Sequence, residues 1–154
     1  MTQEDKELLL LKDLSARYPY GVKIMYEGWD SDHGCEFNTV EELVGIDDRF
    51  IYTLWRGERD KHSIKEPFSI TDYKPYLRPM SSMTEEERFE VEQIIYDVEV
   101  QDDFLSLLSS SIKRLSYAEL LAVFDWLNAH HFDFRGLIEK GLAIEVNETN
   151  NPYK

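Results

Sequence analysis

The hydrophobic pattern of this chain changes its period at the stretch Pro79-Met80-Ser81-Ser82-Met83. Before this stretch, short runs of β-branched and aromatic residues alternate with turn residues, which is typical of strands. After it, apolar residues recur every three or four positions, which is typical of amphipathic helices. A chain that carries the two patterns in succession is predicted to adopt an α+β fold, with a helical C-terminal half packed on a small sheet.

A helix is also predicted ahead of the strands, over Gln3–Arg17. Thr2 and Asp5 have the spacing of a capping box, although Asp is a weaker partner than Glu at that position. Apolar side chains then recur on one face of the helix, at Leu8, Leu11 and Leu14.

The strands are expected between residues 18 and 78. A short strand is predicted at Val22–Tyr26, a hairpin from Val40–Ile46 and Phe50–Trp55 around an Asp-rich turn, and a further strand near Phe68–Ile70. Because Tyr73–Pro79 holds two prolines, it is predicted to be an extended connector and not a central strand. These elements predict a mostly antiparallel sheet that could close into an SH3-like barrel.

The helical part is expected between residues 84 and 141. Capping boxes mark two helix starts, Thr84 with Glu87 and Ser116 with Glu119. The remaining predicted elements are a helix at Asp102–Ile112, a last short helix capped by Asp133 and ending near Lys140, and a strand at Leu142–Val146. The whole chain, residues 1–154, is predicted to be one domain with a flexible polar tail at 147–154.

The charge balance limits the possible partners. Lys plus Arg number 17 and Asp plus Glu number 31, so the formal net charge is −14. Such a surface repels phosphate backbones and anionic membranes, so neither direct nucleic-acid binding nor membrane binding is expected. It favours basic partners, and it also keeps a protein soluble whatever its function. The expected partner is therefore a protein of unknown identity.

The single cysteine, Cys35, cannot form an internal disulfide, which is typical of a protein in a reducing compartment. The N-terminal residues are acidic, and the apolar run Leu8–Leu11 is too short for the core of a signal peptide. No stretch approaches the roughly twenty apolar residues that a membrane span needs. A cytoplasmic location is expected.

The loop Asp30–Glu36 gathers carboxylates, an imidazole and a thiol, which are groups that can bind metals. A calcium loop of the EF-hand type places glycine at its sixth position, and Cys35 stands there instead. A zinc site needs further ligands from elsewhere in the chain, and apart from the C-terminal histidine pair the only other histidine is His62. The favoured interpretation is a solvated turn between strands.

The other candidate is the adjacent pair His130 and His131. Neighbouring positions point to different sides of a helix end, so the two imidazoles are not expected to chelate one metal. The favoured interpretation is a helix cap and turn, and the alternative is an edge that contacts a partner. No catalytic, cofactor-binding or metal-binding residue is assigned and no cofactor is predicted. The predicted interaction surface consists of Trp29, Asp30, Asp32, His33, His130 and His131.

Three stretches of the sequence, residues 16–22, 73–87 and 124–143, resemble segments of small uncharacterised acidic proteins. The third stretch, which begins with Phe124-Asp125-Trp126-Leu127-Asn128-Ala129-His130-His131-Phe132-Asp133, is quite specific. The proteins in this family are encoded in prophages and other mobile elements of gut bacteria. The resemblance implies a phage or mobile-element context, and it implies no activity or site residue.

The leading hypothesis is therefore a non-enzymatic accessory protein that binds another protein. One alternative is an acidic DNA mimic that inhibits a nucleic-acid-binding enzyme, which requires a continuous stripe of carboxylates on one face. A second alternative is a small enzyme or metal-dependent hydrolase that uses the Asp30–Glu36 loop, where Cys35 and His33 would need a base within hydrogen-bond reach. A third is a sensor with a deep apolar pocket.

Overall fold

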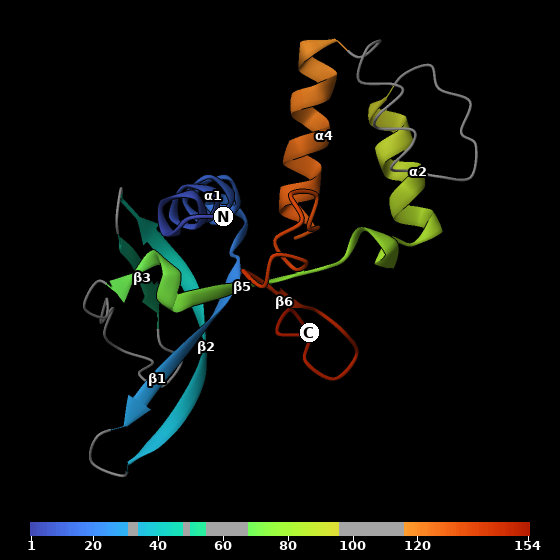
Figure 1. Cartoon of the computed structure of the whole chain (residues 1–154). Coiled ribbons are helices and arrows are strands. Elements are labelled where there is room, and N and C mark those ends of the chain that lie inside the picture. Colours follow the sequence, from blue (N-terminus) through green and yellow to red (C-terminus); the bar gives the residue numbers. More distant parts are fainter. Residues whose placement is uncertain (31–33, 48–49, 55–67, 96–115) are drawn as a thin grey trace.

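The computed structural model describes residues 1–30, 34–47, 50–54, 68–95 and 116–154, and it has the predicted α+β architecture (Figure 1). The helices are α1 (Gln3–Arg17), α2 (Glu85–Ile94) and α4 (Tyr117–Ala129), with short 3₁₀ helices η1 (Tyr18–Tyr20), η2 (Ile70–Asp72) and η3 (Met80–Ser82). The strands are β1 (Lys23–Asp30), β2 (Cys35–Ile46), β3 (Phe50–Leu54), β4 (Phe68–Ser69), β5 (Tyr73–Leu77) and β6 (Ile144–Glu145).

The strands form one sheet in the order β4-β3-β2-β1-β5-β6. Every pairing is antiparallel except that of β5 with β6, so the predicted mostly antiparallel sheet and the predicted β2–β3 hairpin are confirmed. Between the described strands the sheet stays open, because β4 and β6 lie at opposite ends of the order and do not pair. The SH3-like barrel does not form.

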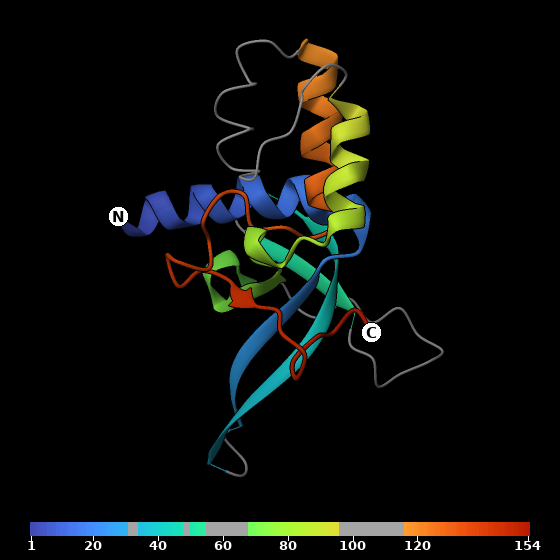
Figure 2. The ribbon, with the colours of Figure 1, turned by 90° about the vertical axis from the view of Figure 1, so that its right-hand side faces the viewer.

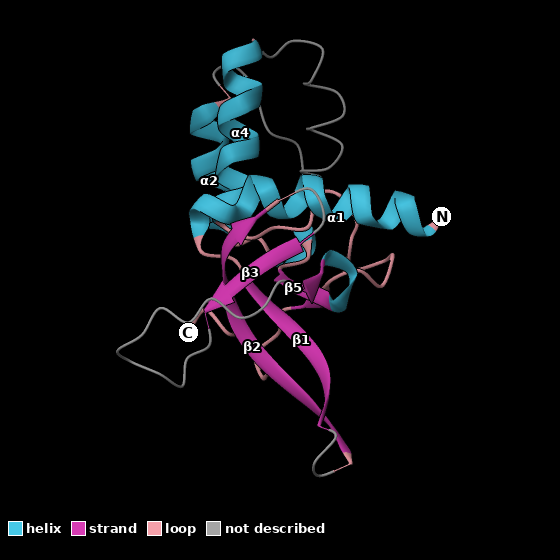
Figure 3. Ribbon diagram, turned by 90° about the vertical axis from the view of Figure 1, so that its left-hand side faces the viewer, coloured by secondary structure: helices cyan, strands magenta, loops and turns pink. Residues whose placement is uncertain are grey.

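Helix α1 packs across one face of this sheet (Figures 2 and 3). Its N-terminus has the predicted capping box, in which Asp5 N–H donates to Thr2 Oγ1 and Thr2 N–H donates to the Asp5 carboxylate. The buried core joins the helix to the strands through Leu10, Leu14, Val22, Ile24, Leu43, Ile51, Ile70 and Tyr73.

The prediction that Tyr73–Pro79 is an extended connector is wrong for most of this segment. The residues Tyr73–Leu77 form strand β5, which lies between β1 and β6, with Pro75 opposite Ile24. Leu43 N–H donates to Val22 C=O, so every second residue of β1, counted from Val22, turns its backbone polar groups toward β2. Ile24 therefore turns its polar backbone groups away from β5, and Pro75, which lies opposite Ile24, needs no N–H on the side of β1. On its other side, β6 pairs only with Tyr76 and Leu77, so Pro75 lies outside that pairing as well.

The described helices of the C-terminal half, α2 and α4, lie side by side (Figures 1 and 2). Both predicted capping boxes are confirmed, at Thr84 with Glu87 and at Ser116 with Glu119. The predicted helix at Asp102–Ile112 lies outside the described residues. The prediction of a last short helix is wrong, because the segment from Asp133 to Lys140 forms turns. The Asp133 carboxylate nevertheless accepts hydrogen bonds from the backbone N–H groups of Leu137 and Ile138.

The segment after α4 joins the helical part to the sheet. Arg78 N–H donates to His131 C=O and Asp133 N–H donates to Arg78 C=O, both at 2.8 Å. Val146 N–H then donates to Leu77 C=O at 2.8 Å, which continues the β5–β6 pairing. The far edge of β5 is therefore covered by the chain that follows α4.

The tail, predicted to be flexible, inserts a tyrosine between two strands. Lys23 N–H donates to the hydroxyl of Tyr153 at 3.2 Å, and that hydroxyl donates to Tyr76 C=O at 2.8 Å. Lys23 and Tyr76 are opposite each other in the register of β1 and β5, so the hydroxyl replaces a direct hydrogen bond between the strands. The tail thereby takes part in the sheet.

A buried ion pair fixes α1 to the segment after α4. Asp13 and Arg17 are fully buried, and the Arg17 guanidinium donates to both carboxylate oxygens of Asp13, at 2.7 and 3.0 Å. Arg17 Nη2 also donates to Phe132 C=O at 2.7 Å, and Arg135 donates to Asp13 at 2.8 Å. Because a buried charge is costly without partners, this arrangement fixes the base of α4 against α1.

Candidate interaction surface

Two of the six predicted interaction residues, Trp29 and Asp30, lie at the outer end of β1. The backbones of Trp29 and Asp30 form the last two positions of β1, opposite Glu36 and Cys35. Asp32 and His33 lie outside the described residues. The strands on either side of the loop, β1 and β2, pair antiparallel, which is the arrangement that the interpretation as a turn between strands requires.

His130 and His131 follow α4, as expected of a helix cap. His130 Nδ1 lies 2.9 Å from Trp126 C=O, and its ring stacks on the Trp126 ring at 3.9 Å between centroids. His131 is buried, adopts a left-handed backbone with φ of 59°, and stacks on Tyr153 at 4.1 Å. Burial, together with the nearby positive charge of Arg17, lowers the pKa of His131 to about 4.

The two halves of the predicted surface do not come together. The outer end of the β1–β2 hairpin and the C-terminal end of α4 are well separated along the long axis of the molecule in all three views (Figures 1–3). His131 is moreover an interior residue with a role in holding the tail. The described members of the predicted set, Trp29 and Asp30 on β1 and the two histidines after α4, therefore lie at separate places in the fold.

A different surface stands out, and it lies on the outer face of α2. Its centre is Phe89, whose side chain is 60% exposed. Glu85 and Glu86 lie one turn before it, and Glu92 and Gln93 one turn after it, so all five share one helix face. The opposite face carries Val91 and Ile95, which are buried against α4. We call these five residues, Glu85, Glu86, Phe89, Glu92 and Gln93, the α2 surface.

Charge is distributed unevenly around α2. Glu87, which lies off the α2 surface, receives two hydrogen bonds from the Arg78 guanidinium, at 2.6 and 2.8 Å, and these lower the pKa of its carboxyl group. Glu85, Glu86 and Glu92 have no ion-pair partner in the described part of the chain. The α2 surface thus combines an exposed aromatic ring with three carboxylates that form no ion pair within the described part of the chain.

Helix α4 also exposes apolar side chains. Tyr117 and Leu121 are one turn apart on one face and are 78% and 47% exposed. Within α4, the one carboxylate that lies one turn from either residue on this face is Asp125, four residues after Leu121, whereas three carboxylates surround Phe89. This face has no charge pattern that selects a partner.

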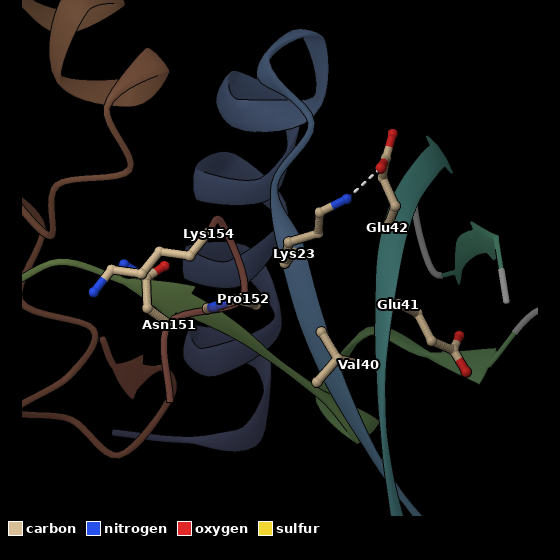
Figure 4. Close-up of a pocket in the computed structure, with 7 residues that line it drawn as sticks. All are labelled: Lys23, Val40, Glu41, Glu42, Asn151, Pro152 and Lys154. Carbon is tan, nitrogen blue, oxygen red and sulfur yellow. Dashed lines mark hydrogen bonds and ion pairs between the residues drawn. The ribbon is translucent and has the colours of Figure 1, made fainter. Parts of the chain in front are cut away.

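A cleft of about 300 Å³ lies between the β1–β2 hairpin and the tail (Figure 4). Lys23 forms an ion pair with Glu42 at its edge, and the Glu41 carboxylate points away from the tail (Figure 4). The remaining lining residues are Val40, Asn151, Pro152 and Lys154. Only two of its seven lining residues are apolar, so it is not the deep apolar pocket that a sensor would need.

Among the described residues, no cluster of three or more His, Cys, Asp and Glu side chains could hold a metal ion. None of the described helices is long and apolar enough to cross a membrane. No protein-family model matches the sequence, and neither the curated proteins nor the solved structures include a significant match.

The sequence contains a signal for the α2 surface, although none of its five residues is among the predicted interaction residues. Phe89 is the one aromatic residue of α2, and it falls half a turn away from the buried stripe that contains Val91 and Ile95. A large apolar residue on the polar side of an amphipathic helix is informative because such positions are normally polar.

Proposed function

We propose that this protein is a non-enzymatic interaction protein that binds a basic surface of another protein through the α2 surface. The observation that carries the proposal is the exposure of Phe89 within a group of carboxylates. Aromatic side chains are enriched at protein interfaces, where they fill pockets at the centre of the contact. The surrounding Glu85, Glu86 and Glu92 would face the positive charges of the partner.

The net charge of −14 supports the same partner chemistry. A strongly acidic protein attracts basic partners over distances of about a Debye length, which raises the rate of encounter and makes it dependent on salt. Phe89 would then supply the short-range contact that charge alone does not give. The DNA-mimic hypothesis is less well supported, because exposed carboxylates occur on separate elements, such as Glu4 on α1 and Glu86 on α2.

The biological setting is part of the proposal and rests on sequence alone. The resemblance to acidic proteins of prophages and mobile elements and the single cysteine support an accessory protein that acts in a bacterial cytoplasm. In that setting the partner would be a host or phage protein.

The test compares three forms of the protein as affinity baits in a lysate of the native host: wild type, Phe89→Ala and Leu121→Ala. Leu121 is the matched control, because it is a comparably exposed apolar residue on the neighbouring helix without a group of carboxylates. We expect one or more basic proteins to be retained by wild type and by Leu121→Ala, and to be reduced at least tenfold by Phe89→Ala.

The captured protein is then purified and its affinity measured directly. Replacing Glu85 and Glu86 by glutamine should weaken binding and reduce its dependence on salt, because two charges are removed without a change of size. A partner that binds wild type and Phe89→Ala with equal affinity would show that the α2 surface is not the contact.

A further inference from the structure

The β1–β2 hairpin is longer than the strands on either side of it, and it projects beyond the rest of the sheet (Figures 2 and 3). Its two strands pair with each other from Lys23↔Glu42 to Asp30↔Cys35. Strand β5 pairs with β1 only at Ile24, Met25 and Tyr26. Beyond Tyr26, no described strand lies beside the outer edge of β1.

The pairing with β5 stops at Tyr26 because of η2. Tyr73, the partner of Tyr26, is the first residue of β5, and the three residues before it form the 3₁₀ helix Ile70–Asp72 under α1. A 3₁₀ turn cannot continue a strand ladder. Among the described residues, the outer edge of β1 beyond Tyr26 is therefore left without a partner strand, because η2 takes the place of the chain that would continue β5.

The register shows which backbone groups this edge presents. Val22 C=O accepts from Leu43 N–H, so residues 22, 24, 26, 28 and 30 turn their polar backbone groups toward β2. The alternate residues turn theirs outward, and the hydrogen bond from Lys23 N–H to Tyr153 confirms this. Met25 is opposite Lys74 of β5, and Glu27 and Trp29 are the next outward positions. Together, Glu27 and Trp29 present two backbone N–H and two backbone C=O groups along the edge that continues the line of β5.

We infer that this edge accepts an extended, basic peptide segment of a partner, which adds to β1 as an antiparallel strand in line with β5. Addition of a strand to an open edge is a common mode of peptide recognition, in which the main chain supplies affinity. The charge of the hairpin selects the partner, because residues 27–38 include four carboxylates and no lysine or arginine. A second copy of this chain would bring like charges together and is disfavoured for that reason.

The test uses a short capped peptide of alternating lysine and valine as the probe and isotope-labelled full-length protein. We expect a saturating amount of peptide to slow amide hydrogen exchange at Glu27 and Trp29 at least tenfold. Met25, which already lies opposite β5, should change little. The same peptide with a methyl group on alternate backbone nitrogens carries the same charge but cannot complete the ladder, and it should give no protection.

A pair of variants isolates the backbone contribution. Trp29→Pro removes the outward N–H of residue 29, which an edge strand tolerates, and Trp29→Ala is the matched control for loss of the side chain. We expect Trp29→Pro to bind the peptide at least tenfold more weakly than Trp29→Ala.

Equal binding of the methylated and unmethylated peptides would show that charge attraction alone accounts for the association, and would overturn the inference. The two peptides are compared on the wild-type protein, so this outcome decides the question even if the Trp29→Pro variant does not fold. Protection of Glu27 and Trp29 that rises with protein concentration in the absence of peptide would instead identify a second copy as the occupant, which also contradicts the inference. None of these measurements involves Phe89, so they are independent of the proposed function of the α2 surface.

Discussion

Replacing Tyr153 by phenylalanine tests whether its hydroxyl joins β1 and β5. The hydroxyl accepts from Lys23 N–H at 3.2 Å and donates to Tyr76 C=O at 2.8 Å. Phenylalanine keeps the ring that stacks on His131 but removes both hydrogen bonds. The remaining ring edge also prevents the two strands from closing together, so the N–H and the C=O both lose their partner.

The expected cost follows from the two backbone groups that lose their partner. A buried polar group without a partner costs about 1–3 kcal/mol, and Tyr76 is buried while Lys23 is half-buried. We therefore expect Tyr153→Phe to lower the free energy of unfolding by about 2 kcal/mol. For a chain of this size the midpoint of thermal unfolding should fall by roughly 4–8 °C.

The measurement is urea unfolding followed by circular dichroism, combined with amide exchange at Lys23. Tyr117→Phe is the matched control, because the Tyr117 side chain is 78% exposed and its hydroxyl makes no hydrogen bond within the described part of the chain. The control should stay within about 0.5 kcal/mol of wild type, as is usual for surface changes. A Tyr153→Phe protein as stable as the control, with unchanged exchange at Lys23, would refute the bridging role of the hydroxyl.

Three further predictions concern the buried ion pair of α1, the buried His131 and the N-terminal cap of α2. Asp13→Ala leaves the buried Arg17 without its carboxylate and should cost about 3–5 kcal/mol in urea unfolding, whereas Asp13→Leu combined with Arg17→Met should recover most of that loss. The pKa of His131 is about 4 in the folded protein, against an ordinary value of 6.5. Between these two pH values the unfolded chain binds more protons than the folded protein does. The free energy of unfolding should therefore fall by about 3 kcal/mol as the pH drops from 6.5 to 4. His131→Asn, which tolerates the left-handed backbone, should flatten that slope. Thr84→Ala removes the cap of α2 and should cost about 1 kcal/mol, read from the same urea titration.

The helices and the β2–β3 hairpin could be predicted because their signals are local. A capping box lies within four residues, and all three predicted boxes form. The alternation of a strand and the turn that follows it also lie within a short window. Elements whose structure depends on near neighbours in the sequence are therefore the ones that the sequence predicts correctly.

The elements that were wrong or missed depend on contacts between distant residues. Pro75 enters a strand because its missing N–H faces a side that needs no hydrogen bond there, and this follows from the register with Ile24. Asp13 and Arg17 have the spacing of an ordinary surface ion pair, yet they lie on the buried stripe of α1 with Leu10 and Leu14. Their burial is possible because Phe132 C=O and Arg135 supply further partners from more than a hundred residues away.

These distant contacts also bear on the proposed interaction. The α2 surface belongs to a helix that is tied to the sheet through Arg78 and Glu87 and to α4 through Glu90, which accepts from Trp126 Nε1 at 3.1 Å. The base of α4 is in turn fixed to α1 through Arg17 and Phe132 C=O. A surface held in this way is largely ordered before a partner arrives, so binding loses less conformational entropy than docking onto an unpacked helix would. Loosening the joint with Asp13→Ala should therefore weaken partner binding even though Asp13 lies away from Phe89, whereas the Asp13→Leu and Arg17→Met combination should restore the affinity together with the stability.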